Sequence, residues 1–138
     1  MGHSDTHRQM HDAFNTRDFD TIAERMAPGF IFEDLPQGVT VKTTGELVDY
    51  LRSWSAAFSD ASIGSARYSE GPDHSVALFH ARGHNDGAFG PMQPTGKAVD
   101  VPFCEVAHYA SDGSVLSVEL YYDRVTLLEQ LGVMPAAG

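Results

Sequence analysis

The sequence contains one cysteine, Cys104, among its 138 residues. A single thiol cannot form an intrachain disulfide, and a metal site built from several cysteines is excluded. No apolar run reaches the roughly 20 residues that a membrane-spanning helix requires. The polar start of the chain, residues 1–5, lacks the apolar segment of a signal peptide. These absences predict a cytoplasmic protein with no membrane partner.

Basic residues are also scarce. Nine lysines and arginines stand against 19 acidic residues, which gives a formal net charge of -10 at pH 7. Proteins that bind nucleic acid neutralise its phosphates with clustered lysine and arginine, whereas the basic residues of this chain are scattered. We therefore expect no nucleic-acid partner.

Repeats, low-complexity tracts and linker-like segments are missing as well. A chain of this length can bury a core of its own. Residues 1–138 are therefore predicted to form a single domain.

Apolar residues in the first half of the chain recur mainly at helical intervals. Asp18 has the position of a helix N-cap, and Thr43 with Glu46 has the spacing of a capping box. The predicted elements are a helix around residues 10–14, a helix from Phe19 to Ala27 closed by Pro28 and Gly29, a strand over residues 30–34, and a helix over residues 44–59.

In the second half the apolar period changes to two, which is typical of strands. Asp123 then has the position of an N-cap for a last helix that ends at Gly132. This order predicts an α+β protein with helices packed on one face of a mainly antiparallel sheet. The four predicted strands are Ser62 to Glu70, His74 to His84, Lys97 to Ala110, and Val115 to Tyr122.

Several segments in this order resemble the nuclear transport factor 2-like superfamily, above all SnoaL-type polyketide cyclases and, in the active-site strands, ketosteroid isomerases. The resemblance spans nearly the whole chain. It implies a cystatin-like cone, in which a curved sheet and the helices on its concave face enclose a pocket. The segments that carry it are residues 13–20, 57–60, 90–97, 122–124 and 127–132.

Asp34 is the first candidate catalytic residue. It ends an apolar strand beside a Pro-containing turn, so its side chain can lie at the mouth of a cavity. The segment Glu33 to Gly38 resembles the isomerase segment whose aspartate is the general base, and Asp34 holds that place. An apolar wall raises the pKa of a carboxyl group by desolvation, which suits proton transfer from carbon. The alternative is an aspartate that only stabilises the following turn.

Glu105 is the second candidate, because it is a charged residue inside an otherwise apolar strand. A buried carboxylate must be paired or protonated. In ketosteroid isomerases the matching strand carries an acid that stays neutral and donates a hydrogen bond to the oxyanion, and the resemblance places Glu105 there. The alternative is an ion pair with Arg82 or His80 across the sheet, which would also orient the acid.

Two departures from the related enzymes concern the partners of these acids. Met10 stands where the isomerases have a tyrosine that donates to the oxyanion, and a thioether cannot donate that bond. The catalytic aspartate of SnoaL-type cyclases matches either Asp123, with His108 as its partner, or Leu120, in which case that chemistry is missing. Asp123 also fits a plain N-cap role.

Three histidines, His3, His7 and His11, lie four residues apart and would stack on one face of a helix. That spacing could bind a divalent ion, but no neighbouring carboxylate or cysteine completes the set, so we predict no metal. One of His7 and His11 is expected to border the pocket. The remaining predicted pocket residues, which complete the substrate-binding set with Met10, are Phe14, Phe32, Tyr50, Trp54, His80, Arg82, Val118, Leu120 and Tyr122.

The leading hypothesis is a SnoaL-like cyclase or isomerase-type enzyme that needs no cofactor. Its substrate would be an apolar, polycyclic carbonyl compound, with Asp34 moving the proton and Glu105 stabilising the enolate. The alternative is a non-catalytic module that binds a small apolar ligand or mediates assembly. A homodimer is expected in either case, because such sheets carry a second face apolar enough to need a partner.

Overall fold

The structure is a computed structural model, and it describes residues 2–134. This part of the chain forms four helices and six strands. Their bounds are α1 His3–Asn15, α2 Phe19–Glu24, β1 Met26–Asp34, β2 Val39–Val41, α3 Thr44–Ala57, β3 Ser62–Glu70, β4 His74–His84, β5 Ala98–Tyr109, β6 Val115–Tyr122 and α4 Arg124–Leu131.

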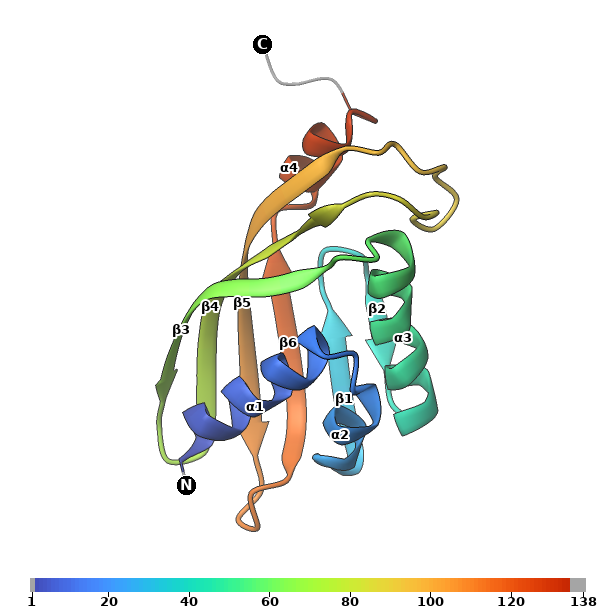
Figure 1. The fold of residues 1–138 in the computed structure, drawn as a ribbon. Helices are drawn as coiled ribbons and strands as arrows, with labels where there is room; N and C mark the ends of the chain where they lie inside the picture. The colour runs from blue at the N-terminus through green and yellow to red at the C-terminus, as the bar shows by residue number, and fades with distance from the viewer. Residues whose placement is uncertain (1, 135–138) are drawn as a thin grey trace.

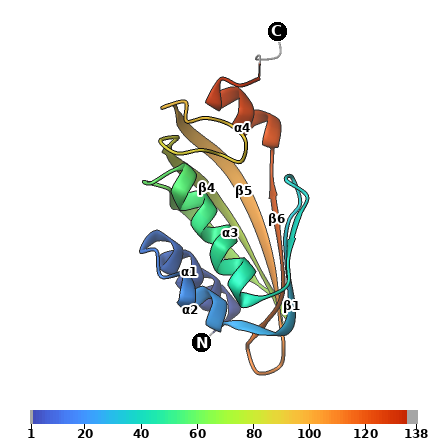
Figure 2. The same ribbon diagram turned by 90° about the vertical axis from the view of Figure 1, so that its right-hand side faces the viewer.

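The six strands form one curved sheet in the order β2-β1-β6-β5-β4-β3. All neighbouring strands are antiparallel except β1 and β6, which run parallel. Helices α1, α2 and α3 cover the concave face, and α4 lies at one end of the sheet (Figures 1 and 2). The predicted α+β class, with a mainly antiparallel curved sheet, is confirmed.

Most predicted element bounds agree with the structure. β3, β4 and β6 have the predicted limits, while β5 and α3 are each two residues shorter than predicted. Asp123 accepts hydrogen bonds from the backbone N–H groups of Val125 and Thr126, and so caps α4 as predicted. Gly132 ends that helix with a φ of 76°, a left-handed conformation that favours glycine.

The entry into β1 differs from the prediction. The second helix ends at Glu24, not at Ala27, and β1 already begins at Met26. This strand passes through Pro28 and Gly29, and its register against β6 shifts there. Proline has no backbone N–H, and strands accept it at such irregular positions. The three-residue strand β2 was not predicted, since it is too short for a periodic pattern and forms by pairing with β1.

Alternation along β5 decides which side chains enter the interior. Phe103, Ala107 and Tyr109 are buried and face the helices. Glu105 lies between them on the same face, opposite Ala77 of β4 and Leu120 of β6. Cys104 and His108 point to the convex face. The sheet therefore directs one carboxylate of β5 into the apolar interior.

Candidate functional site

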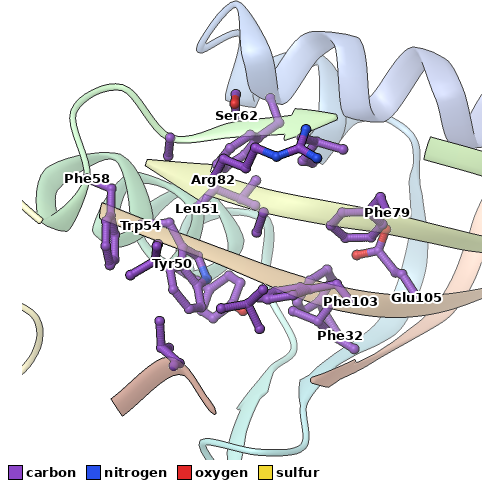
Figure 3. Close-up of a pocket in the computed structure, with 18 residues that line it drawn as sticks. Phe32, Tyr50, Leu51, Trp54, Phe58, Ser62, Phe79, Arg82, Phe103 and Glu105 are labelled. Atoms are coloured by element: carbon purple, nitrogen blue, oxygen red, sulfur yellow. The ribbon is translucent and has the colours of Figure 1, made fainter. Parts of the chain in front are cut away.

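An apolar cavity lies between α3 and the concave face of β4 and β5. It has a volume of about 90 Å³, and Figure 3 shows its aromatic walls, including Trp54, Phe58 and Phe103. A second cavity of about 50 Å³ lies beside it against α1. The residues that line both cavities are Phe14, Phe32, Leu51, Ile63 and Glu105.

Glu105 is the only acidic residue among those lining the two cavities. Its Oε1 accepts hydrogen bonds from His7 Nε2 at 2.8 Å and from His11 Nε2 at 2.7 Å. Within residues 2–134, no hydrogen bond is made by Oε2. The carboxylate is therefore held through one oxygen by α1, and Figure 3 shows the group in the first cavity beside Phe79.

The two histidines are themselves fixed by hydroxyl groups. His7 is fully buried, and its Nδ1 lies 2.7 Å from Ser75 Oγ, which in turn contacts the Tyr109 hydroxyl at 2.7 Å. His11 Nδ1 lies 2.8 Å from the Tyr68 hydroxyl. Each imidazole thus has a partner on both nitrogens, which fixes the direction in which Nε2 points.

The charge state of Glu105 follows from these contacts. Burial alone would raise the pKa of Glu105, but the hydrogen bonds and positive charge of His11 and His7 outweigh burial and hold the pKa well below its usual range. The carboxylate is therefore an ionised hydrogen-bond acceptor rather than a neutral donor. Burial, followed by the charge of Asp12, raises the pKa of Tyr68 to about 12, so its hydroxyl stays protonated.

Asp34 forms a separate buried cluster. Its side chain is fully buried and is absent from the linings of both cavities. Gln37 donates to it from the backbone N–H at 3.1 Å and from Nε2 at 2.7 Å. The Tyr50 hydroxyl donates at 2.7 Å, and the Tyr122 hydroxyl lies 3.0 and 3.1 Å from the two carboxylate oxygens.

The tyrosines connect Asp34 to the aromatic wall. Burial, followed by the charge of Asp34, raises the pKa of Tyr50 and of Tyr122 well above the usual value, so both hydroxyls stay protonated. The Tyr50 side chain lines the first cavity. Tyr122 stacks on Phe103 with ring centroids 4.3 Å apart and an interplanar angle of 6°. Asp34 thus holds groups that shape the cavity.

The other predicted pocket residues divide between the two cavities. Tyr50, Trp54 and Leu120 line the first, and Met10 and Val118 line the second. Phe14 and Phe32 line both. Tyr122 is absent from both linings and packs behind the cavity wall by stacking on Phe103.

The alternative in which Glu105 pairs with Arg82 or His80 across the sheet is wrong. His80 and Arg82 both bind Asp100, at 2.6 and 3.1 Å, while α1 supplies the two partners of Glu105. His80 points away from Phe79 and Ala81, the cavity-lining residues on either side of it in β4. Part of Arg82 does reach the lining of the first cavity.

Asp123 and His108 are not brought together. Asp123 accepts hydrogen bonds from the start of α4. His108 lies on the opposite face of β5 from Glu105, where its Nε2 is 3.2 Å from Glu119. Neither residue is among those that line the two cavities described above.

Sequence reasoning singled out His7 and His11 by their helical spacing but could not identify their partner. They are 98 and 94 residues from Glu105 in the sequence, and only the packing of α1 across β3 and β4 brings them to β5. Their apolar neighbour Met10 was the signal that one of them borders the interior.

The family model of the SnoaL-like polyketide cyclases matches residues 4–131. The match covers nearly the whole chain, and the protein belongs to the SnoaL-like polyketide cyclase family. No curated protein has a significant sequence match to it.

Solved structures share the fold at low sequence identity. A candidate SnoaL-like polyketide cyclase from Jannaschia sp. CCS1 is 21% identical with a TM-score of 0.83, over 96% of this chain and 93% of that one. IdmH, a candidate polyketide cyclase from Streptomyces antibioticus, is 24% identical with a TM-score of 0.78, over 96% and 100%. AclR, a candidate hydroxylase from Streptomyces galilaeus, is 22% identical with a TM-score of 0.79, over 94% and 80%.

Within the described part of the chain, every helix is too short or too polar to cross a membrane.

Proposed function

We propose that the protein is a cofactor-independent enzyme that moves a proton on an apolar, polycyclic carbonyl compound, as in a cyclisation or isomerisation. The observation that supports this most directly is the position of Glu105. An ionised carboxylate with one oxygen bound by two histidines and the other left available lies in a cavity walled by aromatic rings. A carboxylate in that position suits removal of a proton from carbon next to a carbonyl.

In this proposal Glu105 is the base. The proton leaves the carbon atom and binds Glu105 Oε2, and the electron pair moves onto the carbonyl oxygen. In an isomerisation the proton returns to another carbon as the double bond moves. In a cyclisation the enolate carbon bonds to a second carbonyl carbon, and the oxygen of that carbonyl takes the proton from Glu105. His7 and His11 keep Oε1 occupied, so the reacting oxygen is fixed in place. The apolar body of the substrate packs against Trp54 and Phe103.

Asp34 receives a positioning role in this proposal. Its oxygens already accept four hydrogen-bond donors, and it holds Tyr50 and Tyr122 against the cavity wall. The other division of labour, with Asp34 as base and Glu105 as the donor to the enolate, stays a prediction. It is less favoured because a carboxyl group with a lowered pKa has no proton to donate.

The test is deuterium exchange into a bicyclic ketone, 2-tetralone, in D₂O at neutral pH, followed by mass spectrometry. We expect Glu105→Gln to lower the enzyme-dependent exchange rate about 100- to 10,000-fold, the usual contribution of a positioned base. Glu119→Gln is the matched control, because Glu119 is also paired with a histidine but lies on the opposite face of the sheet. Full exchange in Glu105→Gln would refute the role of Glu105.

The same experiment separates an enzyme from a binding module. If wild-type protein binds the ketone and accelerates no exchange, the proposal of proton transfer to Glu105 fails, and the non-catalytic module of the same fold is the better description.

We also propose a homodimer formed through the convex face of the sheet. Leu78, Cys104 and Tyr121 lie side by side there on β4, β5 and β6, and Leu78 and Tyr121 are about 40% exposed. Apolar side chains grouped on an open sheet face favour a second copy of the chain as partner. Sedimentation at micromolar concentration should show a dimer that Leu78→Glu dissociates, and a wild-type monomer would contradict the proposal.

A further inference from the structure

We propose that His7, His11 and Glu105 bind a divalent first-row transition-metal ion of the zinc, cobalt or iron(II) class. Each residue offers one ligand atom, and these atoms all lie within 4.8 Å of one another. Two imidazoles and one carboxylate are a recurring protein donor set for such ions. The prediction of no metal had rested on the lack of a carboxylate near the histidines, and the fold supplies one from β5.

The three residues meet because of their places in the fold. His7 and His11 are four residues apart on α1, so their side chains leave the same face of the helix. Both Nε2 atoms contact Glu105 Oε1, at 2.8 and 2.7 Å. Neighbouring ligand atoms around a tetrahedral ion with bonds of 2.0–2.1 Å are about 3.3 Å apart. Reaching that spacing requires Glu105 Oε1 to move by about half an ångström away from both nitrogens, and the two imidazoles to bring their Nε2 atoms, which lie within 4.8 Å of one another, to about the same separation.

The hydroxyl groups of Ser75 and Tyr68, which contact the histidines, are compatible with both the metal-free and the metal-bound site. Without a metal, each Nε2–H donates to Glu105, and each Nδ1 accepts a hydrogen bond from the hydroxyl group of Ser75 or Tyr68. With a metal, the proton moves to Nδ1 and is donated to the same hydroxyl oxygen, which leaves the Nε2 lone pair for the ion. A hydroxyl can donate or accept, so the tautomers change while every buried nitrogen keeps its partner. Metal-binding histidines usually donate their second N–H in this way.

The three ligands leave coordination positions open toward the cavities. All of them belong to α1 and β5, and Glu105 lines both cavities. A catalytic metal site keeps such an open position for water or a substrate oxygen. The ion would use the same carboxylate as the proposed proton transfer, so it would remove the base. This last consequence, unlike the binding itself, rests on the proposed function.

The test uses the full chain without a histidine tag, dialysed against a chelator and then titrated with Co²⁺ by visible absorption and with Zn²⁺ by calorimetry. We expect one ion per chain, a dissociation constant in the micromolar range or below, and Co²⁺ absorption bands of a four- or five-coordinate site. His11→Gln and Glu105→Gln should each weaken binding at least tenfold. His84→Gln is the matched control, because His84 also contacts a carboxylate but lies on the surface.

Two outcomes would overturn the proposal: no saturable binding below about 100 µM, or binding that survives His11→Gln and Glu105→Gln unchanged. If a ligand variant fails to fold, Tyr68→Phe serves instead, since loss of a hydrogen-bond partner behind a metal ligand typically weakens affinity 10- to 100-fold. Binding and deuterium exchange are measured separately. Metal binding without exchange in the metal-free protein would refute the proposed function alone, and exchange without metal binding would refute this inference alone.

Discussion

The buried Asp34 cluster allows a quantitative test of what holds the aromatic wall in place. Tyr50 and Tyr122 both donate to the fully buried carboxylate. A hydrogen bond to a charged group contributes about 1.5–3 kcal/mol. Tyr50→Phe and Tyr122→Phe should therefore each lower the free energy of unfolding by about 2 kcal/mol. The substitutions remove only an oxygen, so no ring-sized hole is left.

Urea denaturation followed by circular dichroism measures the effect. With a slope of about 1–3 kcal/mol per molar urea, a loss of about 2 kcal/mol moves the midpoint by roughly 1 M. The double variant should differ from the sum of the single variants by at least about 0.5 kcal/mol, because both hydroxyls act on one carboxylate. In that variant Gln37 is the only donor to Asp34 left among residues 2–134.

Tyr121→Phe is the control for this series. The Tyr121 hydroxyl also donates to a carboxylate, that of Glu119 at 2.8 Å, but Tyr121 is exposed. Its loss should cost at most about 0.5 kcal/mol, as is usual for surface changes. If Tyr122→Phe costs no more than Tyr121→Phe, the reasoning about Asp34 as a buried anchor of the two tyrosines is wrong.

Three further predictions concern other parts of the molecule. Trp54 is the only tryptophan, and it lines the first cavity. Binding of 2-tetralone should therefore change the intrinsic fluorescence of the protein saturably. An unaltered emission spectrum on binding would place the ligand elsewhere. Asp123→Ala should lower the free energy of unfolding, measured in urea, by about 0.5–2 kcal/mol through loss of the α4 cap. The deuterium-exchange activity of the folded variant should stay within a factor of about two of the wild type. Because the pKa of Glu105 in the fold lies well below the ordinary 4.5, the unfolded chain takes up the proton more readily, and ionised Glu105 stabilises the fold fully above about pH 5. That contribution is lost as the pH falls further, so chelator-treated wild type should lose more stability between about pH 5 and 3 than Glu105→Gln, and equal losses would argue against an ionised Glu105.

Much of the fold was predictable because its signals are local. Strands β3, β4 and β6 show alternation together with turn residues at their ends, and α3 and α4 begin at capping residues, so their bounds followed from a few neighbouring positions. Elements that depend on distant partners were missed. β2 exists only through its pairing with β1, and the start of β1 is extended because β6 lies beside it.

The candidate site shows the same division between local and distant effects. The sequence by itself determined that Glu105 is an acid inside an apolar strand, that His7 and His11 share a helix face, and that Asp34 ends a strand beside a turn. Each of these properties depends on residues within a few positions. The sequence also carried the family pattern, which the match over residues 4–131 confirms.

Only the tertiary structure decided which of these groups meet. The alternative interpretation of Glu105 paired it within the sheet, with His80 or Arg82, yet both of those side chains bind Asp100. The true partners are nearly a hundred residues away on α1. A periodic pattern reveals which face a residue occupies but not which element covers that face, because that depends on how helices and sheet pack over the whole chain. For Glu105, this packing decided the two contacts that keep it ionised.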